Sequence, residues 1–227
     1  MRRITGSVLV VLCAIVVATS FISSAVAGWQ QAQVAKVNFT PIPGGPYRID
    51  SAHSIIGFAI KHYEISLVKG RFRDFSGNIR YDDQDVTKSS VEFAAKIESI
   101  NTGVDRRDAH LRTADFLDAA KYPEMTFKST RVESKGTDQY VLHGDLTLKG
   151  VTKPVSLPFK LTGAIKDGQG NPRFGVAAQT TINRRDFGIT WGKPMENGGL
   201  DVGNEVMIDL QLEAVFTPAP KPATTQP

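Results

Sequence analysis

The sequence contains almost no cysteine. Its one cysteine, Cys13, lies in an N-terminal segment that begins with two arginines, continues with an apolar run over residues 8–17 and ends in a small-x-small site at 25–27. These features are typical of an export signal, and we expect residues 1–27 to be removed. A mature chain without a thiol would exclude disulfides, cysteine nucleophiles and thiolate metal sites.

The sequence also lacks a hydrophobic run long enough to cross a bilayer. A transmembrane helix needs about 20 apolar residues, and polar residues from Thr19 onward interrupt the N-terminal run. A retained membrane anchor is the alternative to a cleaved signal, and the interruption favours cleavage. We therefore expect no stable membrane insertion of the mature chain.

Charge of one sign is not in large excess. The chain has 27 lysines and arginines against 23 aspartates and glutamates, and removal of Arg2 and Arg3 with the signal leaves 25 against 23. No run of basic residues breaks this near balance. The sequence therefore gives no support to a nucleic-acid partner.

Catalytic signatures are missing as well. The sequence has no His-Glu-x-x-His motif, no Gly-x-Ser-x-Gly elbow and no phosphate loop. His53 and His62 are nine residues apart, which places them on opposite faces of a strand or helix. His110 lies among aspartates that favour a solvated network, and His143 is expected at the surface. We predict no catalytic site, no metal and no cofactor; the alternative is a metal- or histidine-dependent enzyme, or a quinone-linked electron-transfer protein, that uses His53, His62 and His110.

What the sequence does have is strong two-residue alternation of apolar and polar side chains. It predicts about eight strands with one apolar face each, near residues 47–63, 67–81, 91–97, 126–134, 140–148, 155–165, 172–183 and 206–216. Several of the connections are so short that neighbouring strands must be antiparallel. Such strands form a two-sheet sandwich or a closed barrel, and only closure removes the exposed edges.

The remaining segments depart from this alternation. Residues 105–121 predict one or two short helices, with Asp105 as the N-cap and Pro123 as a stop, that cover an end or an edge of the sheet. We interpret residues 28–46 as a polar linker and the Pro/Thr-rich residues 217–227 as a disordered tail.

Small residues recur among the bulky ones at positions that should point inward, namely Gly57, Ala95, Gly144, Gly163 and Ala178. In a sandwich, side chains of the opposite sheet would fill these notches. In a barrel of about eight strands, small inward residues favour a lumen that holds one ligand. An apolar, elongated cavity would take an apolar, elongated guest.

Six blocks carry a family resemblance. In chain order they are YRIDSAHSIIGFAIKH, GRFRDFSGNI, RRDAHLRTADFLDAAKYPEMTF, GDLTLKGVTKPVSL, NRRDFGI and VGNEVMIDLQLEA. Together they resemble the YceI-like family of exported polyisoprenoid-binding proteins over residues 47–216. The resemblance implies an extended lipocalin-like antiparallel β-barrel of the bacterial periplasm, often dimeric, whose lumen binds, transports or stores a long isoprenoid or similar amphiphilic lipid.

The resemblance also implies the class of guest, which is an isoprenoid quinone, a prenyl phosphate or a fatty amide, and assigns the helical segment a covering role. An envelope interaction module with a filled core is a further alternative. From strand phase, we predict that the lipid is lined by Phe58, Ile60, Phe72, Phe93, Ile97, Phe127, Leu146, Leu148, Phe159, Leu161, Val176, Ile182, Ile208, Leu210 and Leu212. The candidates for contact with a polar head group are His53, His62 and Arg184.

Overall fold

The computed structural model describes residues 39–137, 139–196 and 198–218. The expected export signal and most of the expected linker and tail lie outside these residues. Within the described residues, no helix is both long enough and apolar enough to span a membrane.

The described chain forms one antiparallel sheet of eleven strands. The strands are β1 (Gly45–Ile49), β2 (Ile55–His62), β3 (Ser66–Phe72), β4 (Phe75–Tyr81), β5 (Ser90–Lys96), β6 (Ile100–Asn101), β7 (Glu124–Gly136), β8 (Gln139–Leu148), β9 (Val151–Lys166), β10 (Pro172–Asn183) and β11 (Val202–Phe216). The helices are α1 (Asp105–Leu111) and the 3-10 turns η1 (Val86–Lys88), η2 (Ile97–Ser99) and η3 (Arg184–Phe187).

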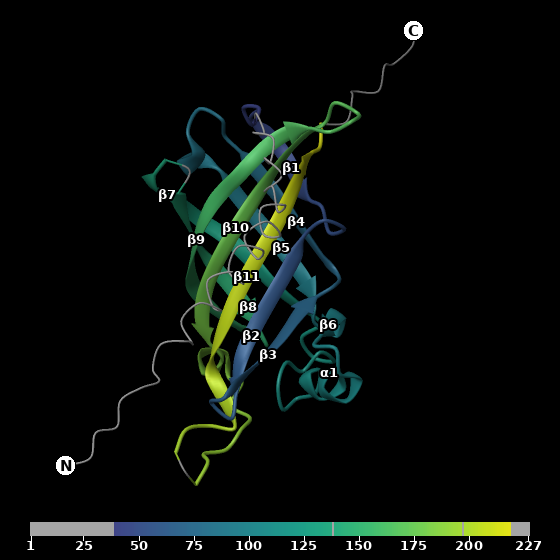
Figure 1. Cartoon of the computed structure of the whole chain (residues 1–227), viewed down its shortest axis with the longest axis vertical. Coiled ribbons are helices and arrows are strands. Elements are labelled where there is room, and N and C mark those ends of the chain that lie inside the picture. Colours follow the sequence, from purple (N-terminus) through teal and green to yellow (C-terminus); the bar gives the residue numbers. More distant parts are fainter. Residues whose placement is uncertain (1–38, 138, 197, 219–227) are drawn as a thin grey trace, which may run out of the picture. The chain divides into compact units, whose positions relative to one another are not determined.

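The sheet closes into a barrel with eight strand positions (Figure 1). Three positions each consist of two consecutive strands in line, because β1 and β2 both pair with β11, β3 and β4 pair with β2 and β1, and β5 and β6 pair with β4 and β3. The strands β7 to β11 fill one position each and pair in chain order. The predicted eight-stranded antiparallel barrel is confirmed.

Strand β1 lies toward the upper end of the barrel (Figure 1), and aromatic side chains from β1, β10 and β11 pack together there. The ring of Tyr47 lies 4.8 Å from that of Phe174 and 5.3 Å from that of Phe216, in edge-to-face contact. Tyr47 is 1% exposed and its hydroxyl donates to the Pro43 carbonyl at 2.8 Å. Burial raises the pKa of Tyr47 to about 12. Side chains therefore close this end.

The helical segment lies at the lower end, between β6 and β7 in the chain (Figure 1). It is shorter than predicted, since α1 ends at Leu111 and hydrogen-bonded turns continue to Tyr122. The prediction of Asp105 as N-cap is wrong, because the cap is Val104 without a side-chain bond. Instead, buried Asp108 accepts hydrogen bonds from the backbone and hydroxyl of Thr102, which fastens the start of the helix to the end of β6.

The described residues flanking the barrel strands are hydrogen-bonded to the sheet. The backbone of Thr40, in the expected linker, donates to Ala164 at 2.9 Å, and that of Thr217, at the start of the expected tail, donates to Pro46 at 2.9 Å. Strand β1 also begins at Gly45, before the predicted end of the linker. Among the described residues, hydrogen bonding to the sheet thus extends beyond both ends of the alternating pattern.

Candidate ligand-binding cavity

A cavity of about 410 Å³ lies inside the barrel, within the range typical of small-molecule pockets. Side chains from most of the strands line it, since inward positions along each strand face the same space. Apolar residues dominate the lining: Ile49, Ile56, Phe58, Ile60, Val68, Phe72, Val91, Phe93, Ile100, Leu111, Phe116, Leu117, Met125, Phe127, Leu142, Leu146, Leu148, Val155, Leu157, Ile182, Ile189, Trp191, Val202, Val206, Ile208, Leu210 and Leu212.

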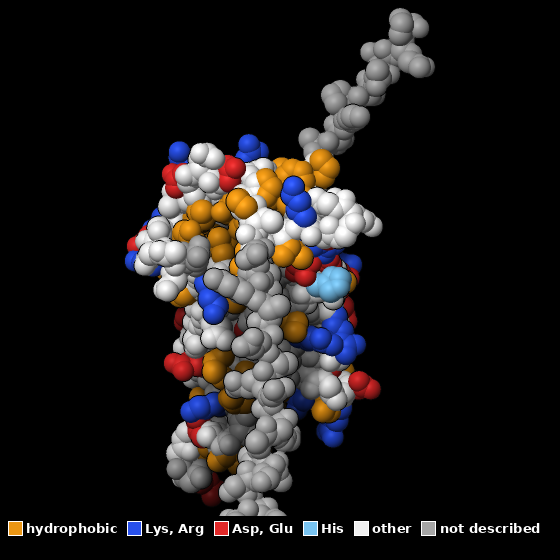
Figure 2. Space-filling view, turned by 45° about the horizontal axis from the view of Figure 1, so that its top comes forward, with side chains coloured by type: hydrophobic (Ala, Val, Ile, Leu, Met, Phe, Trp, Pro, Cys, Tyr) orange, Lys and Arg blue, Asp and Glu red, His pale blue; other side chains and the backbone are white. Residues whose placement is uncertain are grey.

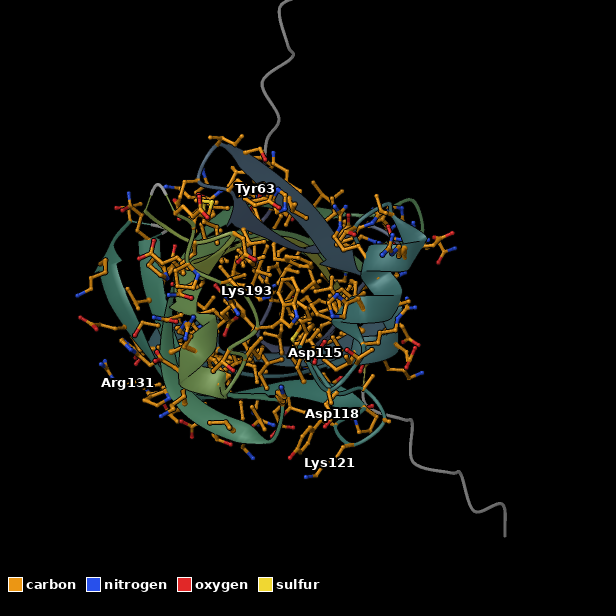
Figure 3. All side chains as sticks on the ribbon, turned by 90° about the horizontal axis from the view of Figure 1, so that it is seen from below. Tyr63, Asp115, Asp118, Lys121, Arg131 and Lys193 are labelled. Carbon is orange, nitrogen blue, oxygen red and sulfur yellow. The ribbon has the colours of Figure 1, made fainter. Side chains whose placement is uncertain are left out.

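The cavity opens at the lower end of the barrel. Tyr63, in the turn between β2 and β3, and Trp191, in the segment after η3, both line the cavity and are 50% and 38% exposed. Figure 3 looks at this end and shows Tyr63, Lys193 and Asp115 around it. We call this opening, between the β2–β3 turn, α1 and the segment after η3, the mouth.

Polar lining residues gather at the mouth. Lys61, His62, Arg107, His110 and Asp201 come from the ends of strands, from α1 and from the segment before β11. Deeper in the barrel the lining is almost entirely apolar. The cavity therefore has an apolar interior and a polar opening, which suits a molecule with an apolar tail and a polar head.

His110 joins three segments at the mouth. Its Nε2 lies 2.8 Å from Asp115 Oδ2, and its ring makes edge-to-face contacts with Phe116 at 5.0 Å and Trp191 at 5.1 Å. The contacts bring α1, the turn after it and the segment after η3 together at one side of the opening.

His62 and Arg184 both line the cavity, but they differ in what their polar atoms do. Arg184 is 3% exposed, and three of its nitrogens donate to the backbone carbonyls of Gly203, Ile189 and Val202 at 2.7–3.1 Å. Burial, followed by the nearby charge of Arg185, lowers its pKa. Arg184 therefore holds the two ends of the segment between η3 and β11 together. His62 lines the cavity beside the mouth, where its ring lies 4.1 Å from the ring of Tyr63.

His53 lies outside the cavity lining, in the turn between β1 and β2. Its side chain is 63% exposed and its Nδ1 lies 3.1 Å from Asp50 Oδ2. With Glu213 these two residues form the one metal-type cluster found among the described residues. Arg173 already bridges the two carboxylates, at 3.0 Å from Asp50 and 2.6 Å from Glu213. Because a guanidinium neutralises these oxygens, the cluster does not suit a metal cation.

A protein-family model described as the YceI-like domain matches residues 47–214. The chain belongs to the YceI-like family. Among its relatives, a UPF0312 protein of Vibrio cholerae is 43% identical over 145 residues, which are 63% of this chain and 77% of the relative. A UPF0312 protein of Shewanella baltica is 38% identical over 169 residues, covering 73% and 84%.

Solved structures share the YceI-like barrel. A YceI protein of Campylobacter jejuni is 31% identical, with a TM-score of 0.60 over 74% of this chain and 96% of that one. BcnA of Burkholderia cenocepacia gives a TM-score of 0.64 at 23% identity over 73% and 98%. A polyisoprenoid binding domain from Saccharophagus degradans gives 0.58 at 18% identity over 75% and 98%. The last two likenesses show the fold alone.

Strand phase placed most of the predicted lining residues of this YceI-like barrel at the cavity wall. Those in the lining are Phe58, Ile60, Phe72, Phe93, Phe127, Leu146, Leu148, Ile182, Ile208, Leu210 and Leu212. Ile97, Phe159, Leu161 and Val176 are not among them. Ile97 is fully buried in η2, Phe159 stacks on Tyr140, and Leu161 and Val176 pack against the core. The alternation along a strand predicts which face of the sheet a side chain lies on, but it does not predict how far along the barrel axis the residue lies.

Sequence reasoning missed two kinds of lining residue. Leu142, Val155 and Val206 are in phase with predicted positions and could have been found by the same alternation. Trp191 lies in a segment without strand or helix periodicity, so no pattern in the sequence assigns it to the mouth of the YceI-like cavity. Phe116 lies within the segment predicted to be helical, but the structure places it in the turns that follow α1.

Two of the small residues of the YceI-like barrel, Gly144 and Gly163, have another role than predicted, whereas Gly57 lines the cavity. A Cβ placed on Gly144 would lie 2.4 Å from Phe127 Cζ, and one on Gly163 would lie 2.2 Å from the ring of Phe39. The expectation that small inward residues open the lumen is wrong at these positions, because neighbouring aromatic rings occupy the space.

Proposed function

We propose that this YceI-like chain binds a long isoprenoid or similar amphiphilic lipid, with the apolar tail in the cavity and the head group at the mouth. The observation that carries the proposal is the distribution of the lining, which is apolar inside and polar at the opening. Burial of a prenyl tail stabilises the complex by about 0.8 kcal/mol per methylene removed from water, less the cost of ordering the chain.

The ligand class is supported by the family and by the structural neighbour that is described as a polyisoprenoid binding domain. An isoprenoid quinone, a prenyl phosphate and a fatty amide each carry oxygen acceptors at one end. The imidazole rings of His62 and His110 and the guanidinium of Arg107 carry N–H donors at the mouth. We propose these three residues as head-group contacts.

We further propose that the protein acts as a carrier or store in the periplasm, without turnover. The export-signal features of residues 1–27 support the location. His53 is separated from the cavity lining, so the three histidines of the enzyme alternative do not share one site. The same experiment that identifies the guest also measures whether the protein is the dimer that the resemblance implies.

The test is native mass spectrometry of protein purified from its own envelope, followed by organic extraction of any adduct. We expect a prenyl lipid or a related amphiphile at one molecule per barrel. Protein stripped of lipid should then take up solanesol, a long prenyl alcohol, at the same stoichiometry. A lipid-free protein that takes up no solanesol would overturn the proposal, and a bound metal would favour the enzyme alternative.

A further inference from the structure

Large apolar side chains are exposed around the mouth. In and beside the β2–β3 turn, Tyr63 is 50% exposed, Ile65 is 87% exposed and Leu67 is 47% exposed. Trp191, in the segment after η3, is 38% exposed. Single exposed apolar residues are common on protein surfaces, but several at the rim of one opening indicate an interaction site.

The β2–β3 turn and the residues beside it, 61–67, which we call the tip, contain a backbone conformation that is unfavourable for residues other than glycine and asparagine. Tyr63 and Glu64 both have left-handed backbones, with φ of 50° and 59°, at positions where two-residue turns favour Asn or Gly. The turn is closed by the bond from Ile65 N to the His62 carbonyl at 3.2 Å. It is fastened to the start of β11 by the bond from Tyr63 N to the Asp201 carbonyl at 2.9 Å. This shape presents Ile65 to solvent.

The tip has the chemistry of a membrane-interface segment. Tyrosine and tryptophan prefer the boundary between lipid head groups and acyl chains. The charges of the tip are paired, because Lys61 Nζ lies 3.3 Å from Glu64 Oε2. A locally neutral, aromatic and aliphatic surface fits a neutral lipid surface better than an acidic partner.

The tip is also continuous with the cavity. Tyr63 and Trp191 contribute both to the cavity lining and to the exposed rim, so a guest that leaves the barrel passes directly between them. The upper end differs, although Figure 2 shows apolar side chains gathered near it and Ile165 is 44% exposed. There the aromatic core around Tyr47 closes the barrel, so an apolar surface at that end leads to no opening.

We propose that the mouth docks on the surface of a lipid bilayer, with Ile65 and Leu67 among the acyl chains and with Tyr63 and Trp191 at the level of the head groups. A lipid tail then moves between bilayer and cavity without crossing water. The purpose of this docking rests on the proposed function. The docking itself is measured on protein without a guest.

The test uses the full mature chain, stripped of lipid, and co-sedimentation with phosphatidylcholine vesicles. Ile65→Ser should weaken binding at least about tenfold, since burial of an isoleucine side chain is lost. Ile165→Ser is the matched control and should bind within about twofold of the parent. In a Trp29→Phe background, which leaves Trp191 as the one tryptophan, emission should shift to the blue on vesicle addition. Binding should change little with salt, because the tip is neutral.

Three results would overturn the docking proposal: no vesicle binding by the parent, equal binding by Ile65→Ser and the parent, or a parent dimer that Ile65→Ser separates into monomers while vesicle binding stays the same. The last result would assign the tip to an interface between two copies. Solanesol uptake is measured on the same samples. Vesicle binding without uptake by the parent would contradict the proposed function but leave docking in place.

Discussion

At the level of single residues, the wall of the cavity depends on glycines that lie next to aromatic rings. Phe127 lies against Gly144 of the neighbouring strand, and Phe58 lies against Gly70. Both rings line the cavity. The glycines thus set the position of the rings, and the rings set the shape of the space that is left.

Gly144→Ala tests this dependence. The added Cβ would meet Phe127 Cζ at 2.4 Å and the backbone oxygen of Lys128 at 2.5 Å, so that a rotamer change of the ring alone cannot relieve the overlap. We expect a loss of about 1–3 kcal/mol in the free energy of unfolding, measured by urea denaturation. Gly168→Ala, where a Cβ meets nothing within 4 Å, is the control, and equal stability of the two variants would contradict the interpretation.

The elements that are not strands decide what the barrel can do. The segment between η3 and β11 carries Trp191 and borders the mouth. Among its described residues it has no strand, but an isolated bridge joins Pro194 and Leu200, and the backbone of Asp201 donates to the Lys193 carbonyl at 3.1 Å. Arg184 of η3 supplies order by binding carbonyls near both ends of the segment. A buried cation thus adds to the few backbone bonds within this segment.

Arg184→Met should destabilise the protein by at least about 2 kcal/mol, because buried carbonyls lose their donors. This corresponds to a fall of several degrees in Tm for a domain of this size. Differential scanning calorimetry measures the change. Arg185→Met is the matched control, since the Arg185 side chain is exposed and its Nε binds only the Asn204 side chain at 2.7 Å. If both variants have the same Tm as the parent, Arg184 does not stabilise the segment.

The turn between β9 and β10 contains a carboxyl group, that of Asp167, from which we predict that the stability of the protein depends on pH. The Arg173 side chain, followed by the backbone of Asn171, holds the pKa of Asp167 at about 2, below its ordinary 3.8. A depressed carboxyl pKa contributes stability that is complete above the unfolded pKa and is lost as the pH falls through the folded value. Asp167→Asn should therefore lower Tm above about pH 5, and the difference from the parent should vanish by about pH 2.

The measurement is Tm against pH for both proteins in one buffer series. Asp145→Asn, at an exposed position on β8, is the control and should show the same fall in Tm at acid pH as the parent. A Tm difference between Asp167→Asn and the parent that stays constant from pH 6 to pH 2 would show that the hydrogen bonds to Arg173 do not depend on ionisation of Asp167.

The sequence predicts the structure of segments in which apolar residues recur with a regular period, and it does not predict the structure of segments without such a period. Alternation predicts which side of each strand faces inward, and short turns predict which strands are neighbours, so the barrel and most of its lining follow. Trp191 lies in a segment without a period, and the role of Arg184 depends in part on the backbone carbonyls of Val202 and Gly203, which lie 18 and 19 residues from it in the sequence. The height of Phe159 along the barrel depends on the register of all the strands together.

For the whole molecule, the two ends of the barrel have opposite properties. Aromatic packing around Tyr47 closes the upper end, and the lower end opens between Tyr63 and Trp191. In the part of the chain that the structure describes, the cavity therefore opens at the lower end, and the aromatic core around Tyr47 limits its length toward the upper end.

Val155→Trp tests the whole cavity as the binding site. Val155 lines the cavity and is paired with Gly144 of the neighbouring strand β8. An indole at this position should occupy space that a prenyl tail needs. We expect solanesol uptake, measured by native mass spectrometry, to fall at least about tenfold while the fold is kept. Lys160→Trp, at an exposed position on the same strand, should take up solanesol like the parent. Unchanged uptake by Val155→Trp would place the lipid elsewhere.

Strand β11 closes the barrel. It pairs with β10, β1 and β2 at once, and the bond that follows it joins Thr217 to Pro46 across 171 residues of sequence. Contacts between such distant residues form slowly and late. Until β11 is available, the edges of β10, β1 and β2 stay open, and open edges promote aggregation. A ribosome or translocon that releases the chain before β11 would therefore yield an aggregating product rather than a partly active barrel.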